Sequence, residues 1–182
     1  MTTLRARVLS PSSPTAVTWH ADGVLAFDGG RITHVGPYDG RPVDEHLPDH
    51  VLTPGFVDAH VHYPQTRIIG SASGPLLAWL ARSTFPEEAR FADTAHAAAV
   101  AEVFCEQLVR AGTTLCFAYS SVHPQACHAL FAALDRWGLR AIAGPVLMDE
   151  DAPPELLLPI DAALEGLEGL RARWHGHDDR LQ

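Results

Sequence analysis

The stretch LTPGFVDAHVH, residues 52–62, decides the fold of this chain, because it joins an apolar run to two histidines spaced two apart. The β-branched Val61 separates His60 from His62, and the stretch predicts a buried strand. Side chains at i and i+2 of a strand point to one face, so both imidazoles can reach one metal ion. Neutral imidazole is a common zinc ligand. The pattern therefore predicts a metal site at His60 and His62.

The surrounding residues strengthen this interpretation. A bare His-x-His pair is weak, since the chain has 11 histidines and repeats the spacing at His175 and His177. Around residues 52–62, however, a Pro-Gly pair precedes the strand and Pro64 follows it, so His62 lies where a strand gives way to a loop. Ligands at the end of a strand suit the active site of an α/β barrel. Histidines satisfied by hydrogen bonds alone remain the alternative.

Strand and helix patterns alternate along the rest of the chain, which predicts parallel βαβ units. The apolar stripes of the helices are expected to be core, not cofactor sites. Expected helices cover residues 93–112, 124–138 and 160–174, and expected strands cover 113–119 and 140–148. The stripes comprise Val100, Val103, Phe104 and Leu108, then Cys127, Leu130, Phe131, Leu134 and Trp137, then Ile160, Ala163, Leu164, Leu167, Leu170 and Trp174.

The first 50 or so residues predict a separate β unit without chemistry. Alternating residues 24–27 and 31–35 flank Asp28-Gly-Gly30, which is a hairpin pattern. The histidines of this region are expected to be solvated or to lie on strand edges.

Several motifs in collinear order give a family resemblance. Residues 53–62 resemble the opening metal motif of the amidohydrolase superfamily. Within that superfamily the chain resembles the guanine deaminases, through residues 63–65 (YPQ), 75–80 (PLLAWL) and 84–91 (TFPEEARF), and through Gly138-Leu-Arg, Met148-Asp and Ala152-Pro. The resemblance runs from about residue 22 to residue 182.

The resemblance implies a (β/α)8 barrel hydrolase that converts guanine and water to xanthine and ammonia, in purine catabolism. It implies one divalent metal, Zn²⁺ or iron, held by His60 and His62, and a Gln65 amide that hydrogen-bonds the edge of the purine. Asp58 is expected to support the site without ligating the metal. Trp79 and Phe85 either wall the substrate pocket or pack the long segment after the first strand. Homodimers are common in this family.

Length sets the limit of this interpretation. A barrel of this type needs about 250 residues, whereas the chain has 182. If the barrel begins near Val51, some three β/α units fit into the chain. We therefore expect an α/β protein in which residues 1–51 form part of a small β-sandwich. Residues 52–182 are expected to form the first part of a TIM-like barrel, which is incomplete in this chain. The remaining metal ligands and the proton-shuttling glutamate would lie beyond Gln182, so no catalytic residue is assigned within the chain. We therefore expect a fragment without appreciable deaminase activity.

Two later loops hold weaker candidates. His123 follows the second barrel strand, but it stands where a helix cap is expected. Residues 149–151 form an acidic loop that is more typical of a solvated charge cluster.

Composition limits the classes of molecule that this chain is expected to bind. The formal net charge of −9 disfavours nucleic acid and anionic membrane surfaces. No apolar run approaches the roughly 20 residues of a membrane span, and no signal-peptide core is recognised, so we expect a cytoplasmic protein. The 3 cysteines, Cys105, Cys116 and Cys127, lack zinc-binding spacing and are expected to be buried free thiols.

Other functions stay open at this point. His-x-His also suits a cytosine or triazine deaminase or a cyclic amidase. A non-catalytic remnant or interaction module would need a partner chain, and a small α/β protein could carry these histidines without binding anything. Cytidine-deaminase-type zinc enzymes are excluded, because neither His-x-Glu nor Pro-Cys-x-x-Cys occurs.

Overall fold

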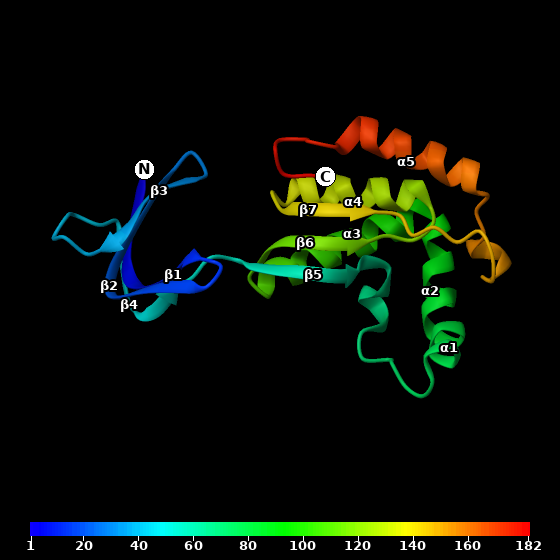
Figure 1. Ribbon diagram of the computed structural model, residues 1–182, viewed down its shortest axis with the longest axis horizontal. Helices are drawn as coiled ribbons and strands as arrows, with labels where there is room; N and C mark the ends of the chain where they lie inside the picture. Colours follow the sequence, from blue (N-terminus) through cyan, green and yellow to red (C-terminus); the bar gives the residue numbers. More distant parts are fainter. The chain divides into compact units, whose positions relative to one another are not determined.

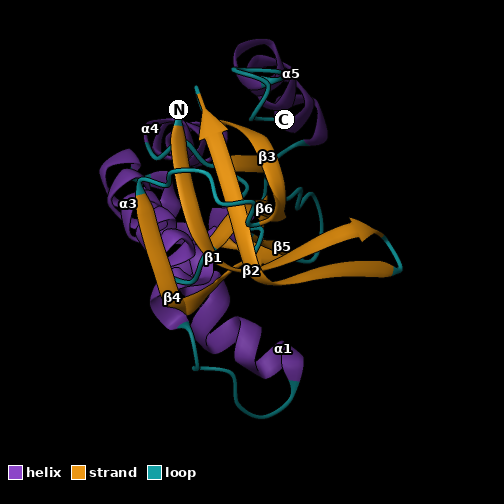
Figure 2. Ribbon diagram, turned by 90° about the vertical axis from the view of Figure 1, so that its left-hand side faces the viewer, coloured by secondary structure: helices purple, strands orange, loops and turns teal.

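The computed structural model describes residues 1–182, which form two compact units, Met1–Pro54 and Gly55–Gln182 (Figure 1). Each unit has its own sheet, and Figure 2 distinguishes the helices and strands by colour.

The first unit is a four-stranded sheet with the order β3-β2-β1-β4. Its strands are β1 (Thr2–Ser13), β2 (Ala16–Asp28), β3 (Arg31–Pro37) and β4 (Glu45–Leu52). The predicted hairpin is confirmed: β2 and β3 pair antiparallel, and Gly29 and Gly30 have φ values of 52° and 75° at the turn. A side chain there would be strained, which explains the Gly-Gly pair.

Strand β4 corrects one detail of the sequence interpretation. Val51 and Leu52 pair in parallel with Arg7 and Val8 of β1, so they belong to this first sheet. They were expected to begin the first barrel strand. The chain leaves strand geometry between Leu52 and Phe56, where Pro54 offers no N–H for pairing.

The second unit contains the predicted parallel βαβ arrangement, the first part of a (β/α)8 TIM-like barrel. Strands β5 (Phe56–His62), β6 (Thr113–Tyr119) and β7 (Arg140–Gly144) lie in the order β5-β6-β7 and pair in parallel. The connecting helices are α3 (Thr94–Arg110) and α4 (Pro124–Arg136), and α5 (Ile160–Trp174) follows β7. Helices α4 and α5 pack against each other, and Figure 1 draws them next to β7. Residues 180–182 add a further parallel segment beside β7, through Gln182 N–H to Ala141 O at 2.9 Å.

The segment between β5 and α3 is a succession of short helical turns, where the sequence indicated a long loop. It comprises η1 (Tyr63–Ile68), α1 (Leu76–Trp79), η2 (Leu80–Thr84), α2 (Phe85–Ala89) and η3 (Arg90–Ala92). Asp93 then caps α3, because its carboxylate accepts from Ala95 N–H at 2.8 Å.

The core lies between the sheet and its helices, and each of the three predicted stripes is only partly buried. Leu130 and Leu134 of α4 are fully buried, but Trp137, placed in the same stripe, is 39% exposed and donates its indole N–H to Glu102 at 2.8 Å. Val103 of α3 is exposed as well. In α5 only Ala163, Leu170 and Trp174 are buried, while Ile160, Leu164 and Leu167 are exposed. Helical periodicity identifies the apolar face of a helix. How much of that face is buried depends on the width of the sheet or helix that packs against it.

Two strand predictions also need correction. Strand β5 is not buried, since Phe56 and Val57 are 62% and 57% exposed. It pairs only with β6, and its other edge has no strand partner. Strand β7 ends at Gly144, short of the expected residue 148, because Pro145 cannot donate to a ladder.

Candidate functional site

The two histidines of β5 lie together on the face of the sheet that points away from the helices. The register pairs Val61 with Ala118 and His62 with Tyr119. Ala118 is buried in the core, and Val61 packs against that core, so the alternating His60 and His62 take the opposite face. Their ring centroids are 5.2 Å apart.

Tyr119 completes this cluster, and sequence reasoning did not single it out. Its ring stacks on His62 with a centroid distance of 4.8 Å and lies 5.2 Å from the ring of His60. The one available signal is its position as the last residue of the second barrel strand, next to the end of the first. The aromatic ring restricts the rotamers of both imidazoles.

The histidine pair fits a divalent metal. A tetrahedral ion with bonds of about 2.0–2.1 Å to nitrogen places the centroids of two ligating rings roughly 5 Å apart. The Nδ1 atom of His62 is buried without a hydrogen-bond partner, as a ligating nitrogen would be when its ion is absent. Burial, and secondarily the charge of His60, lowers the pKa of His62 and favours the neutral, ligating form.

A cleft of about 610 Å³ adjoins these rings along the free edge of β5. His60, His62 and Gln65 all line it, together with Trp79. The indole N–H of Trp79 donates to Ser71 at 3.2 Å, which fixes the ring as a wall of the cleft. Phe85 is not among the lining residues, so of the two aromatic residues considered only Trp79 takes this place.

Asp58 is the only carboxylate that lines the cleft. Its Oδ1 accepts a hydrogen bond from the backbone N–H of His60 at 3.2 Å. The contact orders the strand at His60, and it agrees with the supporting position expected from the sequence.

The side chain of Gln65 is hydrogen-bonded to a buried carboxylate. Its Nε2 donates to Oε1 of Glu88 in α2 at 3.4 Å. Glu88 is 3% exposed and Glu87 beside it 7%, and neither was singled out from the sequence. In the sequence, the TFPEE stretch only resembles a family motif, and nothing in it indicates that both glutamates point inward.

The two glutamates have different environments. Glu87 lies among two arginines and a histidine: its carboxylate is 2.8 Å from Arg90, 3.3 Å from His96 and 3.7 Å from Arg67. Glu88 forms no ion pair, and its Oε2 is buried without a partner. Burial therefore raises the pKa of Glu88, and the Gln65 contact partly offsets that effect.

The weaker candidates lie apart from the cleft lining. His123 precedes α4 at the cap position, without capping it through its side chain, and burial lowers its pKa. Its Nε2 is buried and unpartnered. Asp149 and Asp151 belong to an exposed bend after β7, where a solvated cluster is the natural interpretation.

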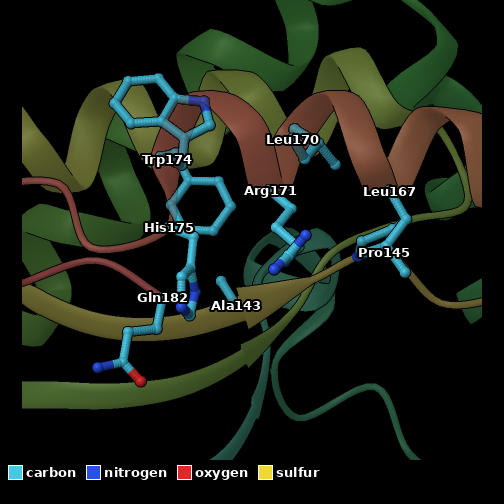
Figure 3. Close-up of a pocket in the computed structure, with 9 residues that line it drawn as sticks. Ala143, Pro145, Leu167, Leu170, Arg171, Trp174, His175 and Gln182 are labelled. Atoms are coloured by element: carbon cyan, nitrogen blue, oxygen red, sulfur yellow. The ribbon is translucent and has the colours of Figure 1, made fainter.

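A second, more apolar pocket of about 210 Å³ lies between α5 and β7 (Figure 3). Leu167, Leu170 and Trp174 of α5 line it, opposite Ala143 and Pro145. Its polar lining residues are Arg171, His175 and Gln182, and the one hydrogen bond among them is between backbones, from His175 N–H to Arg171 O. The pocket has no convergent chemistry, so the His60 cleft is the better candidate site.

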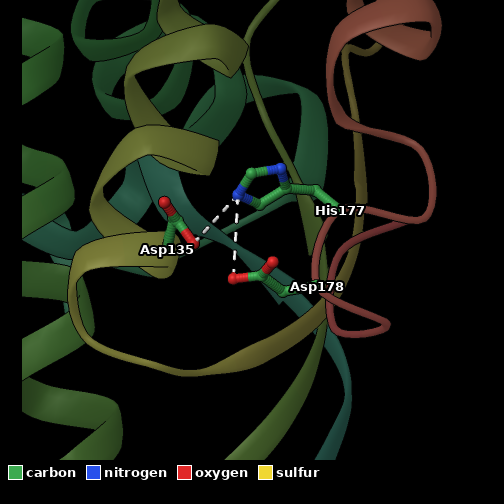
Figure 4. A group of neighbouring side chains, drawn as sticks. All are labelled: Asp135, His177 and Asp178. Atoms are coloured by element: carbon green, nitrogen blue, oxygen red, sulfur yellow. Dashed lines mark ion pairs between the residues drawn. The ribbon is translucent and has the colours of Figure 1, made fainter.

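Asp135, His177 and Asp178 also approach one another (Figure 4). Nε2 of His177 is 3.3 Å from Asp135 and 4.0 Å from Asp178. Arg180, however, already bridges both carboxylates, at 2.6 Å to Asp135 and 3.2 Å to Asp178. The cluster is an ion-pair network that ties the end of α4 to residues 177–180.

The family model described as "Amidohydrolase family" matches residues 51–177. The chain belongs to the amidohydrolase family. Members are typically metal-dependent, in keeping with the histidine pair on β5.

Among amidohydrolases the similarity points to guanine deaminases. The chain is 35% identical over 170 residues to guanine deaminase from Escherichia coli, a match covering 88% of this chain and 38% of that protein. It is 40% identical over 187 residues to a probable guanine deaminase from Deinococcus radiodurans, covering 94% of this chain and 43% of that one. The solved structure of the E. coli enzyme superposes with a TM-score of 0.91 at 32% identity, covering 100% of this chain and 45% of the other. The chain thus spans less than half the length of these relatives.

None of the helices combines the length and the apolar character needed to cross a bilayer.

Proposed function

We propose that this chain provides the first metal ligands and the base-contacting amide of a guanine deaminase, which converts guanine and water to xanthine and ammonia. The observation that carries the proposal is the convergence of His60, His62 and Gln65 on one cleft. The similarity to named guanine deaminases supports the choice of substrate.

His60 and His62 would hold one divalent metal, zinc or iron. Such an ion, when bound, supplies Lewis acidity that brings the pKa of water towards neutrality. Tyr119 stacks on His62 and limits the rotation of that ring, while the contact from Asp58 orders the backbone at His60. The protein residues thus fix the directions of the two ligating side chains before any ion binds.

Gln65 would hydrogen-bond the edge of the base, since an amide offers a donor and an acceptor side by side. Trp79 would cover the base and exclude water from one side of the cleft. Neither residue moves a proton. The reaction also needs an acid–base group, and no glutamate lines the cleft of this chain.

The proposal is tested in two measurements. Zinc-loaded chain should bind guanine, seen as quenching of tryptophan fluorescence, and Gln65→Leu should weaken that binding by about tenfold, because one base contact is lost. Ammonia release from guanine should be negligible for the chain alone, since the cleft has no proton-shuttling glutamate. Preference for cytosine or a triazine over guanine in the same binding assay would contradict the assignment of substrate.

Compartment and assembly remain part of the proposal. We infer a cytoplasmic location, and the family resemblance implies homodimers of the whole enzyme. Size-exclusion chromatography with light scattering would test the homodimer.

A further inference from the structure

The buried carboxylate behind Gln65 has no assigned task. Glu88 lies in α2, 23 positions along the chain from Gln65, and it does not line the cleft itself. Its contact with Gln65 is its one side-chain hydrogen bond, and its second oxygen has no partner. A buried carboxylate without a cation is costly, so a fold retains one where it serves a purpose.

The neighbouring Glu87 shows what a purely structural glutamate looks like at this place. It is buried almost as deeply, on the same short helix, but it is surrounded by Arg90, His96 and Arg67. Those contacts fasten α2 to η1, η3 and α3. The one side-chain hydrogen bond of Glu88 is to the amide that lines the cleft, so its polar contact is directed at Gln65.

The contact between the two groups shows how Gln65 is turned. Nε2 of Gln65 donates to Oε1 of Glu88 at 3.4 Å, so the NH2 of the amide faces Glu88. The amide oxygen lies on the other side of the same planar group. It is therefore directed away from Glu88, while Gln65 as a whole lines the cleft.

We propose that Glu88 is a positioning residue that orients the Gln65 amide so that its oxygen accepts a hydrogen bond from an N–H on the edge of the bound base. The inference rests on the proposed function and deepens it: it selects ligands whose edge carries N–H donors, as guanine does. Glu88 does not touch the base, and Gln65 transmits its effect.

Nuclear magnetic resonance of the side-chain amides tests, without any ligand, whether Glu88 orients the Gln65 amide. The Gln65 NH2 signals, assigned by their loss in Gln65→Leu, should be separate and exchange slowly with water in the unsubstituted chain. In Glu88→Leu they should move to the positions of a free glutamine and exchange faster. Glu88→Gln should preserve them, because the new side chain still presents an oxygen acceptor. Glu87→Gln is the matched control and should leave them unchanged.

Guanine binding then tests the recognition, again by tryptophan fluorescence of zinc-loaded chain. Glu88→Leu and Gln65→Leu should each weaken the affinity by about tenfold. Since Glu88 acts only through Gln65, the double variant should also lose about tenfold and not about a hundredfold. A merely structural role for Glu88 would give losses that add.

The outcomes separate this inference from the proposed function. Unchanged Gln65 signals in Glu88→Leu, with circular dichroism showing a folded chain, would overturn the inference whatever the chain binds. Additive losses of affinity would overturn it as well. If Glu88→Leu fails to fold, Glu88→Gln decides: loss of the Gln65 signals in that folded variant would count against the inference. The unsubstituted chain could also fail to bind guanine while the Gln65 signals respond as expected. That result would contradict the proposed function and the role of Gln65 in recognising the base. Glu88 would still be the residue that orients Gln65.

Discussion

The indole N–H of Trp174 donates to Nδ1 of His128 at 2.9 Å, which joins α5 to α4. Nδ1 must be unprotonated to accept this bond, so His128 is held in its neutral form with the proton on Nε2. Burial, and secondarily the charge of Arg173, lowers the pKa of His128 below its ordinary 6.5. The packing of α5 is therefore coupled to pH.

Mild acid should weaken this helix contact. His128 binds a proton more readily when unfolded, so its contribution to stability is present above about pH 6.5 and is lost as pH falls towards the lower pKa of the folded state. The free energy of unfolding in urea should drop between pH 7.5 and pH 5.5, and the drop should be smaller in His128→Gln. Equal drops in the two proteins would show that other groups, such as His62 and His123, account for the whole effect.

Metal binding should depend on both histidines of β5. The purified chain should take up about one zinc ion, and His62→Ala should reduce the affinity by more than about tenfold, since changes outside the ligand shell alone cost about 10–100-fold. Competition with a chromogenic chelator measures this. His50→Ala is the control, because that residue is exposed in the first unit. Equal zinc affinity in His62→Ala and His50→Ala would rule out the site.

The thiols should be inert in the folded chain. Burial raises the pKa values of Cys105, Cys116 and Cys127 to about 12, so at pH 8 all are protonated and enclosed. A disulfide reagent at pH 8 should label them slowly in buffer and rapidly in urea. Because the folded pKa values exceed the ordinary 9.0, stability should also fall as pH rises from about 9 towards 12. Rapid labelling of folded protein would contradict the buried placement.

The core between α3, α4 and the sheet should carry most of the stability of the second unit. Leu130 is fully buried in α4, so Leu130→Ala should lower the free energy of unfolding by about 2–5 kcal/mol through lost burial and a new cavity. Leu77→Ala is the matched control: Leu77 is 77% exposed, and the change should stay within about 0.5 kcal/mol. Urea unfolding followed by circular dichroism compares them, and similar losses would argue against the packing described.

Arg180 should anchor residues 177–182 beside β7. Its guanidinium bridges Asp135 and Asp178 and also donates to Leu139 O at 3.2 Å. Arg180→Gln should cost about 1 kcal/mol and speed hydrogen exchange at the amides of Ala141 and Gln182. Arg171→Gln, at an exposed pair with Glu168, should do neither. If calcium or zinc stabilised Arg180→Gln markedly, the carboxylates would be acting as a metal site instead.

Much of the fold could be predicted from local patterns. The strand Thr113–Tyr119 and the start of α4 at Pro124 lie where the sequence places them, because alternation and proline chemistry act over a few residues. The errors occur where distant parts of the chain decide. Trp137 and Leu164 belong to apolar stripes but stay exposed, since no described element covers them.

In the candidate site, the position of His60 and His62 on one face of the strand follows from period-two alternation, and the structure agrees with it.

The amino-acid sequence by itself determined the order of strands and helices, the hairpin at Gly29 and Gly30, and the histidine pair on the first barrel strand. Only the tertiary structure decided that Tyr119 stacks on His62 and that Glu88 lies behind Gln65. Periodicity reports which face of an element a side chain occupies, which is local information. Which residues then meet depends on strand register and on how α2 packs, and these are settled by contacts between positions far apart in the chain.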